Sequence, residues 1–368
     1  MASSVQLTKF GNQVAGHDKL LQFSTNDLMV IKPSTQTELQ FYEDSQNDLE
    51  FRCWIPKCYG SLHAATESEL QMLEQQQGNG QLEQEGAAQV PLLPQQQQQQ
   101  RLQDSEGRPL DEHLCLENLL HGFTRPCIMD LKIGSRLYDN DADEAKITKM
   151  KENAKGTTIE SLAARIAGMK VYDTTRGEWA LYDKNYGKSR TKDDIADAIL
   201  AYFFPTSSYA HISEEANRKT LKDEKAAITS KRISSNKMEW LLECFIEEVS
   251  GIREYLEEHP SIQLIGSSLL FIYEGDKNAA DAVWKKMLEE DRKEKQQQKE
   301  NEDKEGDEDE EEEEEEERPP MYDLRLIDFA HSSWSSKQEE QDPGILKGLD
   351  SVLKLLEQCL ERQQQEKL

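Results

Sequence analysis

Residues 126–134 constrain the fold more than any other stretch, because they predict a β-strand whose two faces differ in chemistry. Successive side chains of a strand point to opposite sides of its sheet. Asp130, Lys132 and Gly134 therefore share one face. The opposite face carries the apolar side chains expected in a core: Met129, Leu131 and Ile133. A carboxylate beside an ammonium fits either an active site or an exposed ion pair on an edge strand, which contributes only ~0–1 kcal/mol.

The charge of the chain limits what it can bind. Its 368 residues carry a formal net charge of −28, and an uninterrupted acidic run at residues 307–317 contributes 11 of the negative charges. Such a surface repels nucleic acids and anionic membranes, so direct binding to nucleic acid is not expected. An anionic ligand would need a local cluster of basic residues.

The cysteines and apolar segments exclude several other classes of protein. The six cysteines lack zinc-binding spacing and are expected to be reduced thiols, as in cytosolic or nuclear proteins. The first ten residues contain no apolar signal-peptide core. No apolar run approaches the ~20 residues of a membrane span. The length predicts one large domain or two smaller ones.

The N-terminal part predicts a small unit of strands and a helix. Residues 28–32 form an expected strand that Pro33 ends, residues 37–44 a short helix, and residues 55–62 another strand. Lys32 closes the first of these strands. A lysine that binds nucleotide phosphates would lie at such a position, but so would an ordinary lysine that extends its ammonium to solvent. The residues alone leave both interpretations open.

A Gln-rich stretch interrupts this unit. Residues 66–109 have too few apolar side chains to order themselves and predict a disordered insertion in a loop. Order resumes at residues 114–120, which predict a strand and a short connector before the strand at 126–134. This succession is the geometry of a hinge between two lobes. Main-chain groups at such a hinge can pair with an adenine ring.

Basic residues gather after the central strand. Lys146, Lys149 and Lys151 lie near one face of a predicted helix and are the best candidate for a local cationic cluster. The alternative is a solvated helix face whose charge is balanced by neighbouring acidic residues. The sequence of this segment is compatible with both.

The remaining segments predict a second, larger unit. Residues 262–273 indicate a strand interrupted at 266–268, and a last strand-like stretch at 322–333 contains Asp328. Residues 296–320, which include the acidic run, are expected to be a disordered loop. The other expected elements are a strand at 168–172, a basic turn at 186–191, and helices at 194–204, 238–258, 279–294 and 344–363.

These parts fit a two-lobed nucleotide phosphotransferase. Phosphoryl transfer needs a lysine on the nucleotide phosphates, an acidic metal ligand and positive charge around the acceptor. Lys32, Asp328 and the basic segment supply these three groups. Asp328 begins an Asp-Phe pair, as in the metal-binding Asp-Phe-Gly of protein kinases. The sequence lacks a glycine-rich loop of kinase type, a His-Arg-Asp loop and a Walker motif, which disfavours an ordinary protein kinase.

The sequence resembles the inositol polyphosphate kinase family. The most specific of five matching stretches is the signature Pro-x-x-x-Asp-x-Lys-x-Gly at 126–134. The Gln-rich and acidic segments are extra and fall between the motifs. The other four are Gln-Val-Ala-Gly-His at 13–17, Tyr-Gly-Lys-Ser at 186–189, Ser-Ser-Leu-Leu with Tyr-Glu-Gly within 267–275, and Ile-Asp-Phe-Ala-His at 327–331.

Within this family the chain is most similar to the fungal-type multikinases. The string Glu-Asn-Leu-Leu at 117–120, the core of the 126–134 signature and the acid-rich loop carry that likeness. The trisphosphate 3-kinases have a larger inositol-binding insertion and a calmodulin-binding helix, for which this chain has no candidate. The hexakisphosphate kinases, which form pyrophosphates, are the nearest rival.

The resemblance implies an α+β, two-lobed fold related to protein kinases and ATP-grasp enzymes, with a small helical inositol-binding segment. It implies an ATP- and Mg²⁺-dependent enzyme that phosphorylates inositol tris- and tetrakisphosphate toward the pentakisphosphate. Asp130 and Lys132 are the implied catalytic residues, and Asp328 is the implied metal ligand. The implied nucleotide-binding residues are Lys32, Glu117, Leu119 and Ser268. The implied substrate-binding residues are Lys146, Lys149, Lys151 and Lys170.

The resemblance also implies an organisation and a setting. We expect an N-lobe at 1–120 and a C-lobe at 121–368, with the inositol-binding segment at about 139–165. The Gln-rich and acidic segments resemble adaptor segments of transcription complexes, with which fungal multikinases are associated. Transcription-complex partners and a location in nucleus and cytoplasm are therefore expected. Lipid phosphoinositide headgroups stay open as further substrates.

Overall fold

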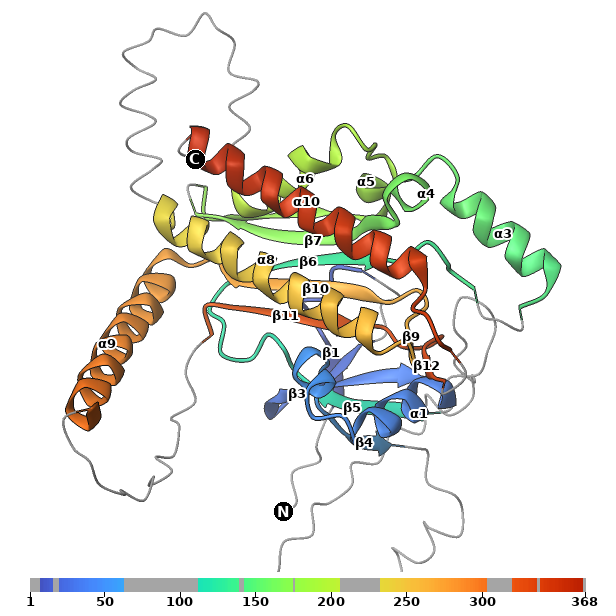
Figure 1. The fold of residues 1–368 in the computed structure, drawn as a ribbon, viewed down its shortest axis with the longest axis horizontal. Coiled ribbons are helices and arrows are strands. Elements are labelled where there is room, and N and C mark those ends of the chain that lie inside the picture. Colours follow the sequence, from blue (N-terminus) through green and yellow to red (C-terminus); the bar gives the residue numbers. More distant parts are fainter. Residues whose placement is uncertain are drawn as a thin grey trace, which may run out of the picture.

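Two antiparallel sheets form the frame of the protein (Figure 1). The computed structural model describes residues 7–15, 20–62, 112–138, 142–174, 176–205, 232–302, 320–335 and 338–366. The first sheet has the strand order β1-β2-β3-β5-β4. Its strands are β1 (Leu7–Lys9), β2 (Leu21–Phe23), β3 (Asn26–Ser34), β4 (Cys58–Leu62) and β5 (Glu112–Glu117).

The second sheet places the signature strand at its centre. Its order is β11-β10-β6-β7-β8, so β6 pairs with a neighbour on each side. The interpretation of Asp130 and Lys132 as a pair on an edge strand is therefore wrong. Met129, Leu131 and Ile133 are fully buried, as the alternation predicts. The strands are β6 (Pro126–Ile133), β7 (Ala164–Asp173), β8 (Glu178–Tyr182), β10 (Ser268–Glu274) and β11 (Tyr322–Ile327).

Long helices cover the apolar face of the second sheet, while the first sheet lies on the opposite side (Figure 1). Helices α8 (Ser235–Glu258) and α10 (Pro343–Glu366) pack against each other along their length. Helix α6 (Ile195–Phe203) lies beside them, and its Tyr202 hydroxyl contacts the carbonyl oxygens of Cys127 and Phe271. The apolar stripe predicted for α8 is buried: Met238, Leu241, Leu242, Phe245, Val249, Ile252 and Leu256.

Shorter elements complete the described chain. Helix α1 contacts the small β9–β12 sheet, and no helix among the described residues is both long and apolar enough to cross a membrane. The helix predicted at 37–44 is confirmed as α1. The elements are α1 (Gln36–Ser45), the 3-10 helix η1 (Phe51–Trp54), α3 (Glu144–Ala154), α4 (Thr158–Leu162), α5 (Lys184–Lys188), β9 (Ile262–Gln263), α9 (Lys277–Glu302) and β12 (Ser333–Trp334).

Several predicted boundaries are wrong for identifiable reasons. Pro33 does not end its strand, because β2 pairs with β3 only as far as Ile31 and leaves that side of Pro33 without a partner strand. The basic turn at 186–191 begins as helix α5, which Asp183 caps by accepting from two backbone N–H groups. Only 58–62 of the strand predicted at 55–62 is extended.

The predicted acidic loop at 296–320 also starts too early, because α9 continues to Glu302. Gln, Glu and Lys are good helix formers, so a polar composition did not end this helix. Residues 303–319 lie outside the described residues, as does the Gln-rich stretch at 66–109.

Candidate active site

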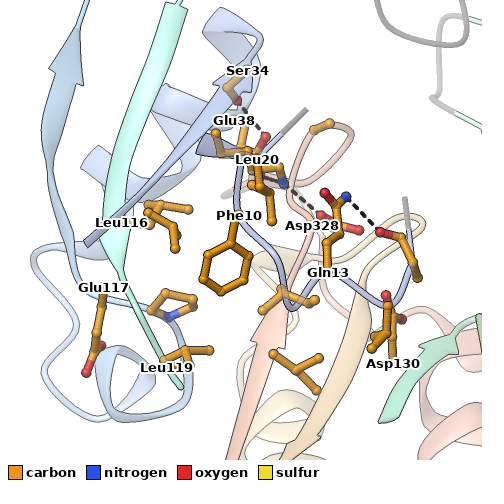
Figure 2. A pocket seen from close by; sticks show the side chains of 18 of the residues that line it. Phe10, Gln13, Leu20, Ser34, Glu38, Leu116, Glu117, Leu119, Asp130 and Asp328 are labelled. Carbon is orange, nitrogen blue, oxygen red and sulfur yellow. Dashed lines mark hydrogen bonds and ion pairs between the residues drawn. The ribbon is translucent and has the colours of Figure 1, made fainter. Parts of the chain in front are cut away.

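A cavity of about 410 Å³ lies between the two sheets. Its lining comes from both lobes: β3, α1 and the end of β5 on one side, and β6, β10 and the end of β11 on the other. Figure 2 shows Glu38 and Leu116 on the side of the first lobe and Asp130 on the side of the second. The face of β6 that carries Asp130 and Lys132 is therefore the face that meets the first lobe.

Lys32 bridges the two lobes inside this cavity. Its Nζ lies 2.7 Å from Oε1 of Glu38 and 2.7 Å from Oδ1 of Asp328. Burial alone would lower the pKa of Lys32, but the two carboxylates outweigh burial and hold it above its ordinary value. The lysine is charged and directed at the cavity, so the interpretation as an ordinary solvent-directed lysine is wrong.

Glu38 is a site residue that sequence reasoning missed. It lies in the first turn of α1, is 1% exposed, and accepts from Ser34 Oγ at 2.6 Å and from Phe329 N at 3.1 Å. Lys32 and Glu38 repeat the ion pair between a strand lysine and a helix glutamate that protein kinases require for activity. A glutamate at the start of a predicted helix six residues after Lys32 was the available signal.

Asp328 follows directly after β11 with a left-handed backbone, φ 67°. Non-glycine residues seldom adopt this conformation, and strained residues of this kind cluster at active sites. Burial would raise the pKa of Asp328, but Lys32 and Lys132 lower it below its ordinary value. Its backbone oxygen accepts from Ser267 Oγ at 3.1 Å, which helps to hold the turn. Asp328 is thus an ionised carboxylate at the cavity surface.

Asp130 faces the same cavity and is 6% exposed. Burial and the neighbouring charge of Asp328 raise the pKa of Asp130 to about 6, against the opposing effect of Lys132. Among the described residues, Asp130 Oδ1 and the buried Ser268 Oγ make no hydrogen bond of normal geometry, although Ser268 lies close enough to Asp130 to lower its pKa as a donor. Lys132 donates to the Gly266 carbonyl at 2.6 Å. Asp130 is therefore a carboxylate with unused acceptor capacity beside a second carboxylate and a lysine.

The connector after β5 forms the far end of the cavity. Glu117 and Leu119 both line it, as the resemblance implied for nucleotide-binding residues. The Glu117 N–H already donates to the Lys57 carbonyl at 2.9 Å, so this amide is used within the first lobe. The rest of this end is apolar, which suits a flat aromatic base. Its apolar walls are Phe10, Leu20, Val30, Leu116, Ile128 and Leu270.

The lysines of α3 lie away from this cavity. Lys149 and Lys151 are exposed, and neither they nor Lys146 is among the described residues that line it. Lys151 borders a separate hollow under α3. Lys170 also lies off the cavity, with its Nζ 2.7 Å from Asn12 Oδ1. Their roles in substrate binding stay predictions that this geometry does not support.

A different set of cations lies beside Asp130. Burial lowers the pKa of Lys184, and the positive charges of Lys188, Arg165 and Lys132 lower it further, so these three groups lie close enough to Lys184 to repel its charge. Arg165 pairs with Lys132 across β6 and β7 and is 7% exposed. Such a cluster supplies the local positive charge that a highly anionic ligand would need on a chain of this net charge.

Gly187 fixes the position of two of these lysines. A Cβ atom at Gly187 would lie 1.8 Å from the Ile166 carbonyl oxygen, so α5 packs backbone to backbone on β7. Lys184 and Lys188 lie at the two ends of this short helix. The Tyr-Gly-Lys-Ser motif was available in the sequence, but the family resemblance gave Arg165, Lys184 and Lys188 no role.

Comparison with known proteins agrees with this geometry. A family model described as inositol polyphosphate kinase matches residues 113–357. The chain belongs to the inositol polyphosphate kinase family. Among its relatives is the inositol polyphosphate multikinase of Saccharomyces cerevisiae, which is 29% identical over 93% of this chain and 95% of its own. Inositol hexakisphosphate kinase 1 of Rattus norvegicus is 26% identical over 88% of this chain and 68% of its own.

A solved structure places the fold in the same family. The crystal structure of the inositol phosphate multikinase Ipk2 from S. cerevisiae, in complex with ADP and Mn²⁺, aligns with a TM-score of 0.55 at 24% identity. The alignment covers 90% of this chain and 99% of that chain. The two-lobed α+β fold related to kinases is therefore confirmed, and this family member is a kinase.

Proposed function

We propose that this kinase is an ATP- and Mg²⁺-dependent inositol polyphosphate multikinase that phosphorylates inositol tris- and tetrakisphosphate toward the pentakisphosphate. One observation carries the proposal: Lys132 links the Lys32–Asp328 pair, with which it shares the cleft, to the cation cluster around Lys184, on which its charge acts. The first pair suits nucleotide phosphates. The cluster suits the phosphates of a small, highly anionic acceptor, which would then meet the nucleotide at Asp130.

Each residue has a defined task in the proposed transfer. The apolar end of the cavity binds the base, and Lys32 contacts the nucleotide phosphates. The acceptor hydroxyl oxygen attacks the γ-phosphorus while Asp130 takes the hydroxyl proton, and ADP leaves. With its pKa raised to about 6, Asp130 is a stronger base than an ordinary carboxylate yet is largely ionised at neutral pH. Lys132 balances charge where donor and acceptor meet.

The carboxylates fit a divalent metal ion. No group of three or more Asp, Glu, His or Cys side chains suited to a metal occurs among the described residues. Mg²⁺ commonly needs only one or two carboxylates, with nucleotide phosphates and waters as its other ligands. Asp328, ionised at the cavity surface, would supply the protein ligand, which leaves Asp130 as the base. When bound, the ion neutralises charge on the transferred phosphoryl group.

The test is direct conversion by the purified protein. Inositol trisphosphate, ATP and Mg²⁺ are expected to give products with four and five phosphates, separated by anion-exchange chromatography. Asp328→Asn is expected to lower turnover by several orders of magnitude while the protein stays folded by circular dichroism. Folded wild-type protein that makes no higher phosphate would refute the proposal, and full activity of Asp328→Asn would refute the metal assignment.

A hexakisphosphate kinase is the second candidate, because rat inositol hexakisphosphate kinase 1 matches 88% of this chain. Such an enzyme would phosphorylate an existing phosphate group instead of a hydroxyl. The alignment with the yeast multikinase, which spans 95% of that protein, favours the hydroxyl acceptor. Equal amounts of inositol trisphosphate and hexakisphosphate in one reaction separate the two candidates by which substrate disappears first.

We also propose that the enzyme works in nucleus and cytoplasm and contacts transcription-complex proteins through residues 66–109 and 307–317. Support comes only from the composition of these segments, which are rich in Gln and in acidic residues respectively. Affinity purification of the full chain and of a chain that lacks both segments tests the idea. Partners retained equally by both chains would contradict it.

A further inference from the structure

Residues 10–15, which we call the N-terminal segment, line the cleft between the two sheets. The segment follows β1 of the first lobe, and the Phe10 N–H donates to the Leu20 carbonyl at 2.9 Å. Figure 2 shows Phe10 beside Leu116 and Gln13 between Asp328 and Asp130. The segment is therefore a wall of the proposed nucleotide site. Five of its residues line the cavity: Phe10, Asn12, Gln13, Val14 and Ala15.

The segment rests directly on β7 at Gly168. A Cβ atom at Gly168 would lie 2.1 Å from the carbonyl oxygen of Val14 and 2.9 Å from its carbonyl carbon. Only glycine allows this approach of two backbones. Gly168 is the register partner of Asp130, so the segment touches the second sheet one strand away from the proposed catalytic carboxylate.

Lys170, two residues after Gly168 on β7, holds the N-terminal segment by a hydrogen bond. Its Nζ donates to Asn12 Oδ1 at 2.7 Å and lies 4.5 Å from the centroid of the Trp179 ring on β8. The ammonium is thus held between an amide oxygen and an aromatic face, a contact that stabilises a cation. Burial lowers the pKa of Lys170. None of these contacts directs Lys170 into the cation cluster around Lys184.

Other contacts between the lobes lie elsewhere. Phe41 of α1 stacks on Phe329 with 4.4 Å between ring centroids, and Trp54 Nε1 donates to Glu248 of α8 at 3.2 Å. Those contacts join the first lobe to the turn after β11 and to α8. The contact of the N-terminal segment with β7 is therefore an independent bridge, and its loss would alter one wall of the cleft without separating the lobes.

We propose that Gly168 and Lys170 are positioning residues for the nucleotide, which act by holding the N-terminal segment against β7. The inference rests on the proposed function, because it takes the cavity to be the nucleotide site. It assigns Lys170 to the nucleotide side of the reaction, whereas the family resemblance implied a contact with substrate phosphates. The two assignments predict different kinetic and binding effects.

The experiment measures ADP binding by calorimetry without acceptor, and separate KM values for ATP and inositol trisphosphate. Lys170→Met and Asn12→Ala are each expected to raise the Kd for ADP about tenfold, which corresponds to ~1.4 kcal/mol. The double variant is expected to match the single variants, because both remove one interaction. Lys170→Arg, which keeps a cation, is expected to restore most of the affinity.

A matched control and a second variant complete the test. Lys285→Met removes a lysine from the surface of α9, where it is 80% exposed, and is expected to leave the Kd unchanged. Gly168→Ala is expected to raise the Kd at least as much as Lys170→Met. If Gly168→Ala fails to fold, the Lys170 and Asn12 variants still decide the matter.

The outcomes separate this inference from the proposed function. Unchanged ADP affinity in Lys170→Met, or a raised KM for inositol trisphosphate alone, would overturn the positioning role of Lys170. Additive effects of the Asn12 and Lys170 variants would overturn the claim that they act through each other. Wild-type protein that binds no nucleotide would overturn the proposed function, and this inference with it.

Discussion

Glu38→Gln removes one negative charge beside Lys32 while it preserves the shape of a buried side chain. Glu38 Oε1 accepts from Lys32 Nζ and Phe329 N, and its Oε2 accepts from Ser34 Oγ. A glutamine oxygen in the place of Oε1 keeps the first two bonds. Its amide nitrogen can donate to the Ser34 hydroxyl, which accepts as readily as it donates. The substitution therefore tests the charge of Glu38 with little change in packing.

The magnitude follows from what charge adds to a hydrogen bond. Hydrogen bonds to charged groups contribute ~1.5–3 kcal/mol, against ~0.5–1.5 kcal/mol for neutral partners. Removing the charge of Glu38 therefore costs about 2 kcal/mol in total. We expect the free energy of unfolding to fall by this amount. If the same loss applies to the transition state, kcat/KM for ATP falls roughly thirtyfold, at ~1.4 kcal/mol per factor of ten.

Urea unfolding and steady-state kinetics with ATP measure the two effects. A lower unfolding midpoint with an unchanged slope reports a loss of stability in the folded state. Ser34→Ala is the comparison variant, because it removes one donor but keeps the Glu38 charge beside Lys32. It is expected to cost ~1.5–3 kcal/mol of stability and to change kcat/KM for ATP less than Glu38→Gln does. Glu38→Gln with wild-type stability and wild-type kcat/KM would refute the role of the Lys32–Glu38 pair.

Three further predictions follow from the site and the acidic run. Asp130→Asn is expected to abolish transfer yet stabilise the protein by about 1–3 kcal/mol at neutral pH, because a pKa raised to about 6 means that the folded state favours the protonated carboxyl. In the wild type, the stabilisation from protonated Asp130 is present below pH ~4 and lost as the pH rises through about 6. Urea unfolding of both proteins across that range checks this, and a variant less stable than wild type at neutral pH would contradict it. Gly187→Ala forces α5 away from Ile166 and is expected to raise the KM for inositol trisphosphate at least about fivefold more than the KM for ATP; equal changes in both would contradict the placement of Lys184 and Lys188. Deletion of residues 307–317 is expected to leave kcat within about twofold in the same assay, since insertions between motifs tolerate change, and a larger loss would tie the acidic run to catalysis.

Local patterns in the sequence were sufficient for much of the fold. Alternation predicted which face of β6 is buried, and the apolar stripe predicted α8, because both follow from the fixed geometry of strands and helices. The pairing of Lys32 with Asp328 joins residues 296 positions apart. No local pattern encodes such a contact, and the sequence predicted only that both residues serve one nucleotide site.

The missed residues had ordinary local explanations. Glu38 in the first turn of a helix is a common feature that the helix dipole favours, so its position six residues after Lys32 was too ordinary a signal to identify it as the partner of that lysine. Lys146, Lys149 and Lys151 form a basic helix face as predicted, but the sequence does not show that this face points away from the cleft. The close approaches at Gly168 and Gly187 depend on tertiary packing and are invisible in a single sequence.

The most direct measurement of the central claim is a time course with ATP, Mg²⁺ and an equal mixture of inositol trisphosphate and hexakisphosphate. The proposed multikinase activity predicts that the trisphosphate is consumed first, through a tetrakisphosphate to a pentakisphosphate, and that Asp328→Asn makes neither product. Exclusive consumption of the hexakisphosphate would contradict the assignment as a multikinase. Consumption of neither substrate by folded, nucleotide-binding protein would contradict the proposed inositol phosphate acceptor.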